Sequence, residues 1–159
     1  MGDKGGKRID GVEVKRLSMY EDGRGRLMEI LRADDSIFRK FGQVYMCTAY
    51  PGWVKGWHLH KRQTDNFTCI KGTMRLVLYD GREKSATKGL LNEFIISLET
   101  PMVVSIPPGV YHGFEALGRG EAIAINTPDY PYNRKRPDEY RLPFNTGKIG
   151  FKWKGKRGG

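Results

Sequence analysis

Three histidines offer most of the chemistry available to this sequence. His58 and His60 lie two residues apart in the stretch VKGWHLH, and His112 follows a Pro-Pro-Gly turn in IPPGVYHGF. Residues two apart in a strand point to the same face, so the first two imidazoles are expected side by side. Imidazole titrates close to neutral pH and serves as a general base or as a metal ligand. Any one histidine alone would be an ordinary polar residue, so the hypothesis depends on all three being brought together.

Strands must position these histidines, because the middle of the chain is a series of short β-branched and aromatic segments separated by turn residues. Strands are predicted at 43–50, 66–80 (broken by Lys71-Gly72 as a hairpin turn), 94–98, 102–106, 111–117 and 122–126. One short helix is expected at 36–41, with Asp34 and Asp35 available to cap it. This pattern predicts an all-β sandwich or barrel, of which the double-sheet jelly roll is one form.

The length of 159 residues fits a single domain. We expect that domain at 11–151, between two flexible, basic, glycine-rich tails at 1–10 and 152–159. The tails carry net charges of +2 and +4 out of the total of +10, which leaves a mildly basic body without a nucleic-acid-binding signature. Nucleic acid is therefore disfavoured as a partner, and an anionic small molecule suits the charge.

Membrane and export signals are not found in the sequence. No apolar run approaches the ~18 residues that span a membrane, and the N-terminus lacks the apolar core of a secretory signal. Cys47 and Cys69 both lie in apolar segments, where they are expected to be buried free thiols. The expected location is the cytoplasm.

The histidine spacing resembles the two motifs of the cupin superfamily. The first motif is matched by Gly52, His58, His60, Asp65 and Gly72, with aspartate where the pattern usually has glutamate. The second is resembled by Pro107-Pro108-Gly109 followed by His112. The resemblance spans about 44–128 and implies a jelly-roll barrel with these side chains in one cavity.

Such a cavity implies two kinds of chemistry. A metal-dependent cupin would use His58, His60, Asp65 and His112 as ligands for one divalent ion, Fe, Mn, Ni or Zn. A cupin without a cofactor would use the same imidazoles as general bases.

The flanking residues resemble the dTDP-4-dehydrorhamnose 3,5-epimerases. Asp22-Gly23-Arg24-Gly25 with Glu29 matches the family's D-x-R-G-x-x-x-E opening, and Lys55-Gly56-Trp57-His58 matches its basic-Gly-apolar-His stretch. The resemblance implies an epimerase or isomerase of a nucleotide-linked 4-keto-6-deoxy sugar, in which His58 removes a proton next to the keto group. It also implies substrate binding by Arg24, Glu29, Gln43, Lys55, His60, Gln63 and His112.

The sequence departs from that family where the other catalytic groups are expected. Asp65 stands where the family has a lysine that helps to stabilise the enolate, and the family tyrosine falls on Ile125 or Asn126. Tyr130 and Tyr132 are the candidates to replace it as the acid. The aspartate that orients the base has no clear counterpart.

Three other functions stay open. The nucleotide-sugar 3,4-ketoisomerases fit the stretch from His58 to Gly72 better, because they carry H-x-H-K at the same spacing. A metal-dependent cupin of other function and a non-catalytic sugar-nucleotide-binding cupin are the further alternatives. The resemblance also implies a homodimer formed by sheet extension, and a place in polysaccharide or antibiotic sugar biosynthesis, with dTDP-rhamnose as the model case.

Overall fold

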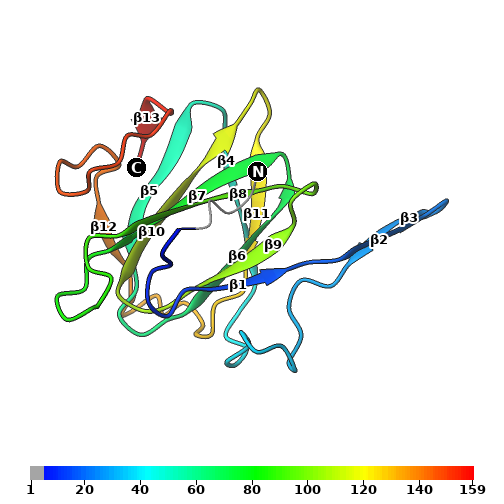
Figure 1. The fold of residues 1–159 in the computed structure, drawn as a ribbon, viewed down its shortest axis with the longest axis horizontal. Helices are drawn as coiled ribbons and strands as arrows, with labels where there is room; N and C mark the ends of the chain where they lie inside the picture. Colours follow the sequence, from blue (N-terminus) through cyan, green and yellow to red (C-terminus); the bar gives the residue numbers. More distant parts are fainter. Residues whose placement is uncertain (1–5) are drawn as a thin grey trace.

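Two β-sheets face each other across one core in the computed structural model, which describes residues 6–159 (Figure 1). The first, here called the β4 sheet, has the antiparallel order β1-β9-β6-β11-β4. Its strands are β1 (Glu13–Arg16), β9 (Met102–Ile106), β6 (Asp65–Lys71), β11 (Ala122–Asn126) and β4 (Tyr45–Ala49). Strand β4 forms one edge of this sheet.

The second, here called the β5 sheet, has the order β12-β5-β10-β7-β8, and β13 pairs in parallel with β5. Its strands are β12 (Tyr140–Leu142), β5 (Trp53–Leu59), β10 (Val110–Leu117), β7 (Thr73–Asp80), β8 (Leu91–Ile96) and β13 (Arg157–Gly158). The predicted break at Lys71-Gly72 does separate β6 from β7, but the predicted hairpin there is wrong, because β6 belongs to the β4 sheet and β7 to the β5 sheet.

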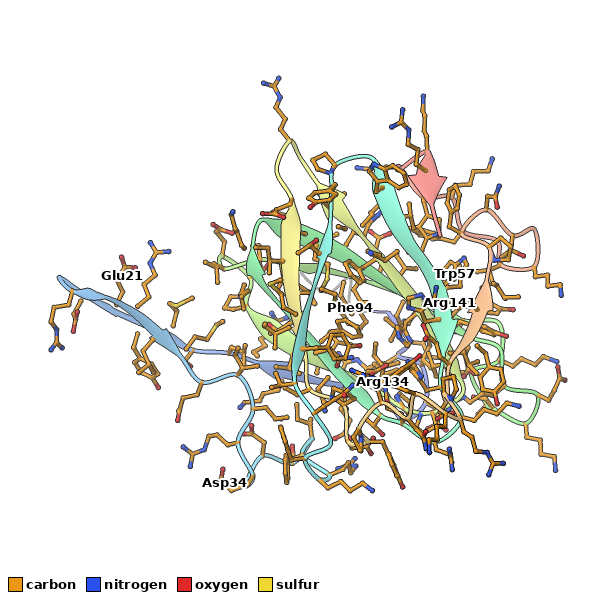
Figure 2. The ribbon with its side chains drawn as sticks, turned by 180° about the vertical axis from the view of Figure 1, so that it is seen from behind. Glu21, Asp34, Trp57, Phe94, Arg134 and Arg141 are labelled. Carbon is orange, nitrogen blue, oxygen red and sulfur yellow. The ribbon has the colours of Figure 1, made fainter. Side chains whose placement is uncertain are left out.

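The core lies between the two sheets and follows from the alternation of each strand. In β11, Ala122, Ala124 and Asn126 are buried, and the residues between them are half-buried. The same inner space is filled from the β5 sheet by side chains such as Leu76 and Phe94, the latter in the middle of the barrel (Figure 2). This double-sheet barrel confirms the predicted jelly roll.

A hairpin of β2 (Met19–Asp22) and β3 (Gly25–Met28) projects away from the barrel (Figure 1). Tyr20 and Leu27 on it are 60% and 59% exposed. The hairpin makes its own two-stranded sheet and pairs with neither of the barrel sheets. It is the only described element that stands outside the barrel.

The predicted helix at 36–41 is wrong, since the structure places only turns at 33–37 and no helix anywhere in residues 6–159. The Asp35 carboxylate accepts hydrogen bonds from the Arg32 backbone and from Lys15, so it binds across the loop instead of capping a helix. No helix in the described part of the chain is long and apolar enough to cross a membrane.

The C-terminal segment, expected as a frayed tail at 152–159, packs on the outer face of the β5 sheet. Trp153 lies 5.0 Å from Trp57 between ring centroids, and the Glu115 carboxylate accepts the backbone N–H groups of Lys154 and Gly155. Of the N-terminal tail, residues 1–5 lie outside the described residues, and Ile9 is buried in the core. The packed body is therefore longer than 11–151 at both ends.

Candidate active site

A cavity of about 900 Å³ opens between the two sheets, and residues 130–139 close one side of it. Its walls come from β4, β5, β6 and β10. Most of the residues singled out in the sequence line it: Gln43, Lys55, His58, His60, Gln63, His112, Tyr130 and Tyr132.

A β-bulge in β5 aims two of these side chains into the cavity. His112 pairs with His58 across the strands, but Phe114 pairs with Lys55, so β5 carries one extra residue between them. Bulges re-aim side chains locally, and this one puts Lys55 and His58, three apart in sequence, on the same wall. Gly113 faces the bulge, where an added Cβ would lie 2.8 Å from the Lys55 carbonyl oxygen, so a larger residue there would displace the strand.

His60, Asp65 and His112 form a cluster at the buried end of the cavity. Asp65 Oδ2 lies 3.2 Å from His60 Nε2 and 3.3 Å from His112 Nε2. Asp65 Oδ1 accepts hydrogen bonds from Gln63 Nε2 and Asn126 Nδ2, both at 2.8 Å. The imidazoles are held from behind, His60 Nδ1 by the Asp138 carbonyl and His112 Nδ1 by the Val110 carbonyl. Three ligand atoms therefore converge on one point.

The three residues of this cluster differ in protonation state. Burial lowers the pKa of His60, but the hydrogen bond and charge of Asp65 outweigh it and raise that pKa to about 8. Burial raises the pKa of Asp65, and the facing imidazoles more than reverse this, so it lies below its usual value. Desolvation keeps the pKa of the enclosed His112 below its usual value. The cluster is thus a His60 imidazolium paired with the Asp65 carboxylate, beside a neutral His112.

His58 stands apart from that cluster and has a different state. Desolvation by burial is the main cause that lowers its pKa to about 4. The Glu139 carboxylate lies 4.0 Å from His58 Nε2 and is the acidic group beside it. An unprotonated imidazole that keeps 24% of its side chain exposed in the cavity is available as a general base at neutral pH.

The rim of the cavity is cationic. Arg62, Arg134, Lys135 and Arg136 line it, three of them from the loop between β11 and β12 where Figure 2 labels Arg134. The neighbouring acids are engaged elsewhere: the Asp138 carboxylate accepts the backbone N–H groups of residues 61–63, and Glu139 accepts from Arg141. The rim suits an anionic ligand.

Two residues from the predicted set lie outside the cavity. Arg24 stands at the tip of the β2–β3 hairpin, 92% exposed, with its guanidinium paired to Asp22. Glu29 follows the hairpin and pairs with Arg32. The structure therefore does not bring Arg24 and Glu29 to the cavity of their own chain.

The four-ligand metal set is also only partly assembled. His60, Asp65 and His112 offer ligand atoms within 4.8 Å of one another, and His58 is not in that group. Asp65 Oδ2 is buried and faces both imidazole nitrogens, so it could serve as the carboxylate ligand between two imidazoles. These three residues could hold a divalent ion.

Several cavity residues escaped the sequence analysis. Tyr45 and Arg62 line the wall, Asn126 and Asp138 hold the buried cluster, and Glu139 lies beside His58. Alternation in QVYMC would have pointed to Tyr45 and Cys47 as the inward residues of β4. The contacts of Asp138 and Glu139 depend on how the irregular segment at 127–139 folds back, and no local pattern indicates that.

Comparison with known proteins gives a family match over residues 20–140, to the polysaccharide biosynthesis C-terminal domain. A spore coat polysaccharide biosynthesis protein of Bacillus subtilis is 39% identical over 91% of this chain and 96% of its own length. A probable low-salt glycan biosynthesis epimerase of Haloferax volcanii is 37% identical over 91% of this chain and 94% of its own.

Solved structures agree with the observed architecture. A dTDP sugar isomerase from Desulfovibrio desulfuricans superposes with a TM-score of 0.87 at 32% identity, covering 92% of this chain and 93% of that one. A dTDP-6-deoxy-D-glucose-3,5-epimerase from Legionella pneumophila has the same fold, with a TM-score of 0.81 at 22% identity over 96% of this chain and 84% of that one.

Proposed function

This chain belongs to the polysaccharide biosynthesis C-terminal domain family and to the dTDP-4-dehydrorhamnose 3,5-epimerase-like cupins, and from that premise we propose that it epimerises a nucleotide-linked 4-keto-6-deoxy sugar. The observation that carries the proposal is His58, an unprotonated imidazole inside a cavity with a cationic rim. The similarity to a probable glycan biosynthesis epimerase supports the reaction class.

The keto group makes the chemistry feasible. A C–H bond next to a carbonyl is acidic because the resulting carbanion is an enolate. His58 takes this proton as general base, and Lys55, on the same wall, lies where it can stabilise the developing oxyanion. Lys55 thus takes over a role that Asp65 cannot perform.

The rim accounts for recognition of the nucleotide. Arg62 with Arg134, Lys135 and Arg136 provides charges for a diphosphate, and arginine forms bidentate hydrogen bonds to phosphate oxygens. Tyr130 and Tyr132, 42% and 53% exposed at the mouth, offer ring faces to the sugar or base. Gln43, Gln63 and the His60 and His112 imidazoles provide polar contacts deeper in the cavity. These assignments are part of the proposal, as is dTDP-rhamnose synthesis as the pathway.

A homodimer would allow Arg24 and Glu29 to reach the cavity of the partner chain. The β4 edge carries exposed Met46 and Tyr50, 60% and 63% accessible, and the projecting hairpin exposes Tyr20 and Leu27. Exposed apolar side chains of this kind mark interaction surfaces. We propose that the hairpin of one chain lies against the β4 sheet of its partner, with Arg24 placed near the partner's cavity.

Incubation with dTDP-4-keto-6-deoxyglucose, followed by NMR of the sugar, tests the reaction. The epimerised 4-keto sugar is the expected product. A 3-keto sugar would instead identify a 3,4-ketoisomerase, and an unchanged sugar bound by the protein would identify a non-catalytic binding cupin.

A metal-dependent cupin is the second candidate, favoured by the convergence of His60, Asp65 and His112. The epimerase proposal involves no cofactor, because the His60 imidazolium already satisfies the charge of Asp65. Elemental analysis of protein purified without chelators separates the two, since stoichiometric Fe, Mn, Ni or Zn would favour the metal enzyme. The free thiols of Cys47 and Cys69 are consistent with a cytoplasmic enzyme, which is also proposed.

A further inference from the structure

Epimerisation needs a proton donor on the side of the sugar opposite the base. The family position of that donor falls on Ile125 or Asn126 in β11, and neither side chain is an acid. In the register of the β4 sheet, Asn126 stands directly opposite Tyr45 of β4. A tyrosine is therefore present one strand away from where the family has it.

The side-chain amide of Asn126 has only one orientation that satisfies its contacts. Its Oδ1 accepts the backbone N–H of Asn66 at 2.9 Å, so its Nδ2 faces the other way. Nδ2 donates to Tyr45 Oη and to Asp65 Oδ1, both at 2.8 Å. Tyr45 Oη is thus the acceptor in its bond with Asn126, and its own proton is not used there.

That proton is available to a ligand in the cavity. Tyr45 lines the cavity wall and is 37% exposed, and its hydroxyl lies against the fully buried Asn126. Within residues 6–159 the hydroxyl has no hydrogen-bond partner besides Asn126. Burial, then the charge of Asp65, holds the pKa of Tyr45 well above its usual value, so the phenol stays protonated at neutral pH.

The two sheets also place a base and an acid on opposite sides of the cavity. His58 belongs to β5 in one sheet and Tyr45 to β4 in the other, and both line the same cavity. A sugar ring held between the sheets therefore meets the base on one face and the phenol on the other. Tyr130 and Tyr132 lie in the exposed mouth, and Tyr130 is stacked under Lys40 Nζ at 3.4 Å from its ring centre.

We propose that Tyr45, held by Asn126, is the general acid that delivers the proton to the enolate from the β4 sheet. The inference rests on the epimerase function proposed above and adds its missing catalytic residue. It replaces Tyr130 and Tyr132 in that role and leaves them as contacts at the mouth.

The proton transfers balance. His58 Nε2 takes the proton from the carbon next to the ketone, and the C–H electron pair becomes the enolate. The enolate carbon then takes the Tyr45 hydroxyl proton on its other face, which restores the ketone with inverted configuration and leaves a phenolate. The imidazolium loses its proton to water and the phenolate regains one from water, so the enzyme returns to its starting state.

The test is Tyr45→Phe, which removes one oxygen, assayed with dTDP-4-keto-6-deoxyglucose in heavy water. Formation of the epimer is expected to fall by roughly 10²–10⁴-fold, the usual contribution of a general acid. Deuterium should still enter the recovered, uninverted sugar, because His58 can remove a proton and return a deuteron on its own face. Loss of inversion with retained exchange is a signature that a merely structural tyrosine would not give.

Two controls keep the outcomes distinct. Tyr79→Phe, on the outer face of the β5 sheet and away from the cavity, should epimerise like the wild type, and dTDP binding and thermal unfolding verify that Tyr45→Phe is folded. Unimpaired epimerisation by Tyr45→Phe would overturn the assignment of Tyr45. Loss of inversion with retained exchange in Tyr130→Phe instead would also overturn it. Absence of exchange and epimerisation in the wild type would instead refute the proposed function.

Discussion

The barrel cavity contains the histidine motifs of the family resemblance, and the β2–β3 hairpin contains its D-x-R-G motif. The two regions differ in burial and in how they are attached to the barrel sheets. The cavity gathers His58, His60 and His112 between buried strands. The hairpin holds Arg24 in solvent, 92% exposed, and pairs with neither barrel sheet. The residues proposed for catalysis are thus held within one chain, whereas Arg24, expected to bind the nucleotide, lies outside the cavity of its own chain.

This difference indicates that the barrel cavity serves catalysis and the hairpin serves assembly. Burial perturbs the imidazole pKa values, which general acid–base chemistry requires, and this happens inside the barrel of a single chain. An exposed guanidinium at a hairpin tip contributes only if something docks against it. Variants in the two regions should therefore fail in different ways.

The largest effect is expected from His58→Ala in the cavity. Removal of the base should lower turnover of the 4-keto sugar by roughly 10²–10⁴-fold, because proton abstraction has no other neutral imidazole aligned beside Lys55. Steady-state kinetics measures this, with dTDP binding as the control for an intact cavity. Full turnover by the folded variant would show that the base is elsewhere.

A smaller effect of another kind is expected from Arg24→Ala on the hairpin. Loss of a hydrogen bond to a charged phosphate costs about 1.5–3 kcal/mol, so nucleotide affinity should drop by roughly 10- to 100-fold with little change in kcat. Arg26→Ala, on the same hairpin and paired with Glu21, is the matched control. An unchanged dissociation constant in calorimetry would remove Arg24 from the site.

Mixing chains tests whether the two regions meet across a dimer. A mixed dimer of His58→Ala and Arg24→Ala chains would contain one site with both residues intact, if each cavity is completed by the partner's hairpin. At substrate concentrations well below KM, where the loss of affinity in Arg24→Ala lowers the rate, activity above that of either variant alone is expected after co-refolding. No recovery in a verified mixed dimer would confine each site to its own chain.

The smallest effect concerns stability and the His60–Asp65 pair. The pKa of His60 is raised to about 8 from about 6.5, so its contribution is fully present below about pH 6.5 and is lost as pH rises through 8. The shift corresponds to at most about 2 kcal/mol. Urea unfolding of the wild type and His60→Gln at several pH values measures it; parallel pH profiles for the two would contradict the ion pair.

Much of this molecule follows from the sequence, for identifiable reasons. Strands β9 and β11 were predicted at their observed bounds, because alternation and turn residues are local properties. The convergence of the histidines followed from motif spacing. Turns replaced the predicted helix near 36–41, since Asp35 binds Lys15 twenty residues away, and no local pattern reports such a contact.

The parts of the site that the sequence could not predict are non-local. The bulge that aligns Lys55 with His58 becomes visible only from its pairing with β10. Asp138 approaches His60 from 78 residues along the chain, and Tyr45 meets Asn126 from 81 residues away. The glycine-rich basic segment at the C-terminus is ordered because it packs on a surface that Glu115 of β10 and Trp57 of β5 provide.

Transfer of solvent deuterium to the sugar tests the central claim most directly. Wild-type protein and dTDP-4-keto-6-deoxyglucose are incubated in heavy water, and the carbons beside the ketone are followed by NMR. Deuterium is expected at such a carbon with the wild type, and its rate of entry is expected to be lower by roughly 10²–10⁴-fold with His58→Ala. A folded wild-type protein that binds dTDP and exchanges no proton would contradict it.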